Sequence, residues 1–87
     1  MNAELLEING QRKAGLPLHF QLTALEHHPY VIIDFGNGVE QRIQKDSFTF
    51  TYDRANRYQI KLKDANGRLL DDIHLDIVGN DALALVQ

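Results

Sequence analysis

Apolar and polar residues alternate one by one along four separate segments of this chain, and this spacing is the strongest constraint on its fold. The alternation holds over residues 16–24, recurs at 48–52 and 58–62, and recurs with one interruption at 69–77. A period of two places successive side chains on opposite faces of a β-strand, whereas the side chains of a helix repeat every 3.6 residues. Each segment therefore predicts a strand with one buried face and one face in water.

Three further segments have the composition of strands without a long alternation. Residues Tyr30–Phe35 are apolar on both faces and lie between a proline and a glycine, which is typical of a central strand. Residues Val39–Ile43 are mostly polar, which suits the edge of a sheet. The segment Leu6–Ile8, just before an Asn-Gly pair, predicts one more short strand.

Turns that contain glycine separate these segments. Gly36-Asn37-Gly38 is expected to reverse the chain after the central strand, because its two glycines allow positive φ at little cost. Asp64-Ala65-Asn66-Gly67 predicts a hairpin of the Asn-Gly type. Asp71-Asp72 interrupts the last alternating segment and predicts a β-bulge there.

About seven short strands with no convincing helix between them predict an all-β protein, an antiparallel two-sheet β-sandwich. An open barrel is the structural alternative. The core is expected to consist of the members of each alternating segment that face inward. These are Leu18, Phe20, Leu22, Ile33, Phe35, Phe50, Tyr58, Ile60, Leu62, Leu75 and Ile77.

The 87 residues contain no cysteine and carry a net charge of −3. This length predicts one domain, residues 1–80, followed by a tail or linker to a following domain at residues 81–87. Without cysteine there are no disulfides and no thiol nucleophile. The basic residues are scattered, which argues against nucleic acid as a partner, and no apolar run is long enough for membrane insertion.

Three segments, in order and spacing, resemble a PKD domain, the immunoglobulin-like module first described in polycystin and common in bacterial surface proteins and secreted hydrolases. The resemblance covers residues 15–78. The parts of this sequence that carry it are Gly15–Phe20 for the family's opening strand, Asp34-Phe35-Gly36-Asn37-Gly38 for its aspartate-phenylalanine-glycine-aspartate-glycine turn, and Thr51-Tyr52, Asn56 and residues 58–62 for its threonine-tyrosine, glycine and tyrosine-x-valine-x-leucine strand.

The sequence departs from the family pattern at four places. Ile33 stands where the family usually has tryptophan, Asn37 replaces an aspartate, and Asn56 replaces a glycine, where it is expected in the left-handed region. The strand at Tyr58 also reaches its hairpin two residues early. The resemblance is thus to a divergent member, and it implies an immunoglobulin-like sandwich in an extracellular or cell-surface protein.

Two groups of residues are expected to act structurally. The Asp34 carboxylate should accept backbone N–H groups from the turn Gly36–Gly38, so that Asp34, Phe35, Gly36, Asn37 and Gly38 form a structural turn motif. Tyr58 resembles a tyrosine corner, with its hydroxyl bonded to upstream backbone near Asp53.

No catalytic, cofactor-binding or metal-binding residues are predicted. The single serine, Ser47, lacks a Gly-x-Ser-x-Gly context, and no glycine loop for phosphate occurs. His27 and His28 are adjacent and point in different directions on an extended chain. Asp34, Asp64 and Asp72 are the carboxylates that three-dimensional proximity would make the first candidate ligands.

The sequence therefore predicts a non-catalytic module of a larger protein that serves as a spacer or binds a protein partner or neighbouring domains. A carbohydrate-binding module, with polysaccharide as its partner, is the alternative. That alternative requires two coplanar aromatic rings in solvent, and without tryptophan only the tyrosines and phenylalanines can supply them. A nucleic-acid-binding barrel would need basic and aromatic residues on one face.

Overall fold

The structure, a computed structural model, describes residues 5–79. The predicted tail at 81–87 lies outside these residues. The described part contains seven strands and one 3₁₀ helix. In chain order these are β1 (Leu6–Asn9), β2 (Pro17–Leu22), η1 (Ala24–Glu26), β3 (Val31–Asp34), β4 (Glu40–Ile43), β5 (Ser47–Thr51), β6 (Asn56–Lys63) and β7 (Leu69–Ile77).

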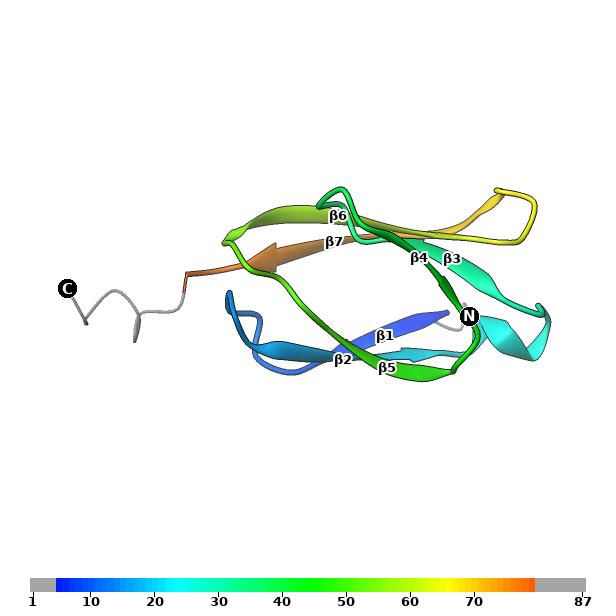
Figure 1. Cartoon of the computed structure of the whole chain (residues 1–87), viewed down its shortest axis with the longest axis horizontal. Helices are drawn as coiled ribbons and strands as arrows, with labels where there is room; N and C mark the ends of the chain where they lie inside the picture. Colours follow the sequence, from blue (N-terminus) through cyan, green and yellow to red (C-terminus); the bar gives the residue numbers. More distant parts are fainter. Residues whose placement is uncertain (1–4, 80–87) are drawn as a thin grey trace, which may run out of the picture.

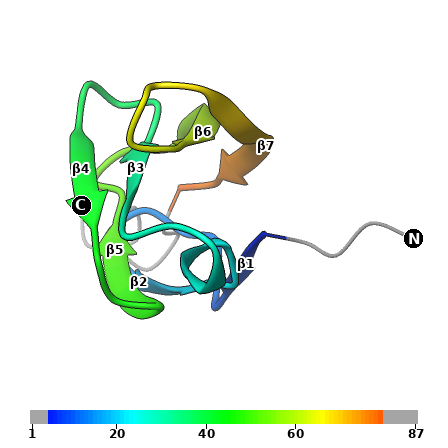
Figure 2. The ribbon, with the colours of Figure 1, turned by 90° about the vertical axis from the view of Figure 1, so that its right-hand side faces the viewer.

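The seven strands form two sheets that lie one over the other (Figures 1 and 2). One sheet has the order β1-β2-β5 and the other the order β4-β3-β6-β7, and every pairing within them is antiparallel. This is the order of an immunoglobulin-like sandwich, A-B-E against C′-C-F-G. The predicted fold class is confirmed. So are the central position of β3 and the edge position of β4.

The alternating side chains bury one face of each sheet against the other, as the period of two predicts. Ten of the eleven predicted core residues are buried, and the exception is Phe50, which is half-buried because β5 lies at a sheet edge. The prediction omitted five buried residues. These are Leu6, Ala14, Val31, Ile43 and Tyr52.

Four phenylalanines join the two sheets at the centre of the core. Phe35, just after β3, stacks on Phe50 of the opposite sheet with ring centroids 3.8 Å apart. Phe20 stacks on Phe48 at 5.1 Å within its own sheet and meets Phe35 edge to face at 5.6 Å. Aromatic pairs contribute about 0.5–1.5 kcal/mol beyond the burial of their area, so this cluster specifies how the sheets align.

The β6–β7 hairpin differs from the sequence prediction in its turn and in its bulge. Gly67 has φ +85°, but no other residue type in the described range has a positive φ. Asn66 is therefore not in the left-handed region that an Asn-Gly type I′ turn requires, and neither is Asn56. The register shift places Leu70 as the extra residue of β7, one position before the predicted Asp71-Asp72 bulge.

The sandwich is elongated, with principal-axis extents of 48 × 23 × 23 Å. β1 and β7 run in the same direction along the long axis, and β7 finishes at the end of the sandwich opposite to the β6–β7 turn (Figure 1). There Lys13 and Val78 form a parallel bridge, with Ala14 N–H donating to the Val78 carbonyl at 2.9 Å. The segment that connects β1 to β2, which are paired in one sheet, thus also bonds to the residue that follows β7 in the other sheet.

Candidate functional site

The turn between β3 and β4 is held by two side chains that accept backbone N–H groups two residues further along the chain. The Asp34 carboxylate accepts the Gly36 N–H at 2.9 Å, and the Asn37 amide oxygen accepts the Val39 N–H at 3.2 Å. The Phe35 N–H closes the turn by donating to the Val39 carbonyl at 3.0 Å. These bonds fix the backbone, and both Asp34 and Asn37 thereby use one acceptor oxygen within the loop.

Gly36 is required in this turn for two separate reasons. Its φ is +83°, which L-amino acids with a Cβ rarely adopt. In addition, a Cβ on Gly36 would lie 2.5 Å from the Gln59 carbonyl oxygen and 2.9 Å from the Gln59 nitrogen. The turn therefore packs directly on the backbone of β6, and this close approach leaves no room for a side chain.

Tyr52 connects this turn to the end of β5. Its side chain is buried, and its hydroxyl donates to the Phe35 carbonyl at 2.7 Å, over a separation of 17 residues. Burial raises the pKa of the Tyr52 phenol well above its usual value, and the nearby Tyr58 and Asp34 raise it further. The phenol thus stays neutral and serves as a hydrogen-bond donor.

Tyr58 has the geometry of a tyrosine corner. Its hydroxyl donates to the Arg54 carbonyl at 2.7 Å, one residue beyond the predicted Asp53 region. Its ring stacks on the ring of Tyr52 with centroids 4.2 Å apart and planes 27° apart. We call residues 34–39 and 52–58 the tyrosine loops, since these two side chains bind the backbone of both.

A cavity of about 390 Å³ lies between the tyrosine loops. It is lined mainly by polar groups, namely Gly36, Asn37, Asp53, Arg54, Asn56 and Tyr58. The Asn56 amide oxygen accepts the Arg57 N–H at 2.7 Å. Asp53 and Arg54 are exposed and give this cavity one carboxylate and one guanidinium. Such a surface can form hydrogen bonds with a polar partner, but it places no nucleophile beside a base.

The three carboxylates named as first candidate ligands lie apart. In the strand register, Asp34 on β3 and Asp72 on β7 both lie opposite Lys61 of β6, which runs between them. Two strand spacings therefore separate the two carboxylates on the sheet. Asp72 accepts the Gln59 amide at 2.8 Å, whereas Asp64 lies in the β6–β7 turn and accepts the N–H groups of Asn66 and Arg68. Among residues 5–79 no three histidine, aspartate or glutamate side chains gather in a way that could hold a metal ion.

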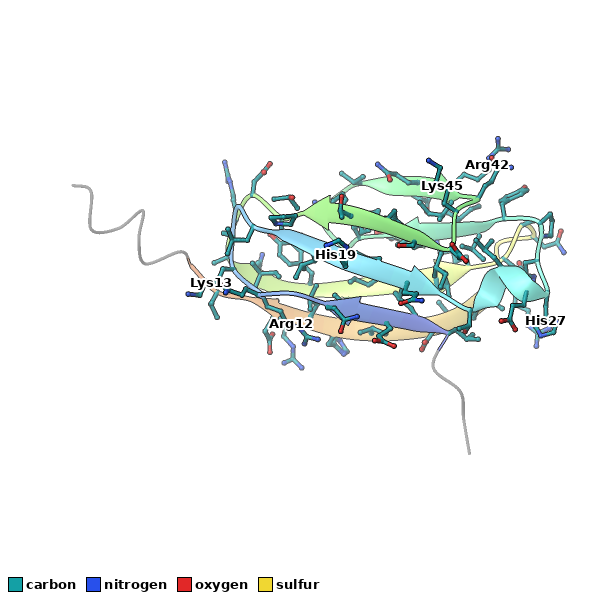
Figure 3. The ribbon with its side chains drawn as sticks, turned by 90° about the horizontal axis from the view of Figure 1, so that it is seen from below. Arg12, Lys13, His19, His27, Arg42 and Lys45 are labelled. Carbon is teal, nitrogen blue, oxygen red and sulfur yellow. The ribbon has the colours of Figure 1, made fainter. Side chains whose placement is uncertain are left out.

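The histidines are dispersed. His27 and His28 follow η1 at the end of the molecule, whereas His19 lies on the outer face of the β1-β2-β5 sheet, as Figure 3 shows for His19 and His27. His74 lies on β7 opposite Gln59.

All seven aromatic residues of the chain lie in the described part, and six of them form one contiguous cluster of stacked and edge-to-face pairs. The seventh, Tyr30, is half-buried and lies under the Arg42 guanidinium, 5.0 Å from the ring centroid. No pair of coplanar rings therefore faces solvent, although this is what a sugar platform on the sheet would need.

Two features of the tyrosine loops escaped the sequence prediction. The hydroxyl of Tyr52 had no assigned partner, because its acceptor is 17 residues away and no local pattern marks it. The contact of Gly36 with Gln59 is likewise tertiary, although the two glycines around Asn37 marked the turn itself.

Neither a scan of protein-family models nor a search of curated proteins finds a match to this chain. In the described residues, no helix has both the length and the apolar character needed to span a membrane.

Proposed function

We propose that this chain is a non-catalytic immunoglobulin-like module of the PKD type within a larger protein, where it separates neighbouring domains or binds another protein. The observation that carries the proposal is the placement of the first and last strands. β1 begins in one half of the molecule and β7 finishes at the end of the other half (Figure 1). The long axis of the molecule measures 48 Å. A module of this shape holds the segments before and after it apart.

The chemistry of the tyrosine loops supports a structural role. The polar groups of Asp34, Tyr52 and Tyr58 each bond to backbone within these loops. Groups used in this way stabilise a scaffold, whereas a catalytic group must be within reach of a substrate. The resemblance of Asp34–Gly38 and of the strand at Tyr58 to the PKD pattern agrees with this role and carries with it an extracellular or cell-surface location.

The aromatic cluster favours this proposal over a carbohydrate-binding module. Binding modules that stack sugars need exposed rings, but the rings of Phe35, Phe50 and Tyr52 pack on one another inside the sandwich. We therefore assign the protein partner to a surface made of exposed strands or loops, and we do not assign a sugar-binding platform.

A replacement experiment in the parent protein tests the proposal. The module is either deleted or replaced by an unrelated β-sandwich of the same length, and the activity or adhesion of the parent protein is measured. A spacer predicts loss on deletion and rescue by the replacement, whereas an interaction module predicts loss in both. A gene that encodes this chain alone, or a parent protein unaffected by deletion, would contradict the proposal.

A further inference from the structure

The four strands at sheet edges differ in how they are protected from pairing with another strand. Natural edge strands carry charges, bulges or inward-facing charged residues that block such pairing. β4 carries Glu40 and Arg42, β7 has its bulge at Leu70 and the inward-facing Asp71, and β1 has only four residues. β5, in contrast, reads Ser-Phe-Thr-Phe-Thr, without charge, proline or bulge.

The free edge of β5 presents a regular row of unpaired backbone groups. The carbonyls of Asp46 and Tyr52, which flank the strand, accept the N–H groups of Leu22 and Gly15 on the side of β2. In an antiparallel pair these directions alternate along the strand. The N–H and C=O groups of the odd-numbered residues, Ser47, Thr49 and Thr51, therefore point away from β2, and in the described residues no other strand pairs there.

The order of residues in β5 is nearly the same in both directions. We propose that β5 pairs antiparallel with β5 of a second copy of this chain, with Thr49 opposite Thr49 at a two-fold axis. This register brings Phe48 opposite Phe50 and Ser47 opposite Thr51, so hydroxyl side chains meet hydroxyl side chains and rings meet rings. The residues at the hydrogen-bonding positions are then the three whose backbone groups point outward.

The residues that flank β5 are complementary in charge in this register. A two-fold axis at Thr49 brings Lys45 opposite the partner subunit's Asp53, and Asp53 opposite the partner subunit's Lys45. Both side chains are exposed, and neither is in an ion pair within residues 5–79. Figure 3 shows Lys45 beyond β5, on the side away from β2. The dimer would thus place opposite charges at both ends of the strand pair.

The pairing would also cover the apolar rim of the core. Phe48 and Phe50 are half-buried because β5 is an edge strand, although their rings stack on Phe20 and Phe35. A second β5 would remove the exposed part of both rings from water and join the two three-stranded sheets into one six-stranded sheet. This inference rests on the fold and does not depend on the proposed function.

The test is the oligomeric state of the full chain, measured by sedimentation equilibrium up to about 1 mM protein, the range of weak association. The wild type should form a dimer, and Thr49→Lys should weaken dimerisation by at least roughly tenfold, since it places two like charges at the axis. The matched control is Gln21→Lys, at another exposed position on the same sheet face, in the central strand β2, which should dimerise as the wild type does.

A charge exchange at the flanks tests the register itself and does not alter the strand. Lys45→Glu should weaken the dimer, and adding Asp53→Lys to that variant should restore it. A wild type that stays monomeric at about 1 mM would overturn the proposal. So would equal dimerisation of Thr49→Lys and Gln21→Lys. If Lys45→Glu has no effect, or if the double variant stays weakened, the proposed two-fold register is wrong.

Discussion

The tyrosine loops and the β6–β7 turn both reverse the chain with a glycine at positive φ, but they differ in what lies around that glycine. Gly36 packs on the backbone of Gln59, and two phenols hold the adjoining segments. Gly67 has nothing within 4 Å of the position of a Cβ, and the turn is held by local bonds only, from the Asp64 carboxylate and from the Asp64 backbone. The same local conformation thus serves tertiary packing in one region and only a local turn in the other.

The largest expected effect is that of Gly36→Ala. The left-handed conformation costs roughly 1–2 kcal/mol for a residue with a Cβ, and overpacking against Gln59 adds roughly 1–3 kcal/mol. Gly67→Ala should lose only the conformational part. Urea unfolding of both variants, followed by circular dichroism, measures the difference. Equal losses of unfolding free energy would show that the contact of Gly36 with β6 has no energetic weight.

The next effect should come from the two phenols. Tyr52→Phe leaves the buried Phe35 carbonyl without its donor and should lower the free energy of unfolding by about 1–3 kcal/mol. Tyr58→Phe should cost less, since its bond to the Arg54 carbonyl is only partly buried and water can replace the donor. If Tyr58→Phe proves the more damaging change, the tyrosine corner, and not the Tyr52 bond, is the main support of these loops.

The raised pKa of Tyr52 in the tyrosine loops makes the free energy of unfolding depend on pH. A tyrosine in the unfolded chain loses its proton near pH 10, whereas the folded chain keeps Tyr52 protonated to higher pH. The unfolded state therefore gains stability as pH rises above 10, and the free energy of unfolding falls. Urea titrations between pH 8 and 11 should show a smaller fall for Tyr52→Phe than for the wild type. Parallel curves would mean that Tyr52 does not cause the loss.

The sequence predicted what depends on local pattern. The period of two located the strands, the run at Tyr30–Phe35 located the central strand, and the glycines around Asn37 located the turn. The sequence prediction was wrong where residues distant in the chain determine the conformation or burial of a residue. Asn56 joins β6 with negative φ, because pairing with Ile77 extends the strand, and Phe50 stays half-buried because β5 lies at an edge.

The smallest expected effect is that of Gly38→Val. It measures the cost of a positive φ in the tyrosine loops without the close backbone contact that Gly36 makes. Gly38 has φ +90° but open space around it, and Gly79 has neither a positive φ nor a close neighbour. Gly38→Val should therefore cost about 1–2 kcal/mol, since valine has a Cβ in the left-handed region, whereas Gly79→Val should leave the free energy of unfolding nearly unchanged. Thermal and urea unfolding of the two variants at pH 7 give the comparison. A loss for Gly38→Val as large as that for Gly36→Ala would mean that the whole β3–β4 turn, and not the approach of Gly36 to Gln59, limits the stability of this region.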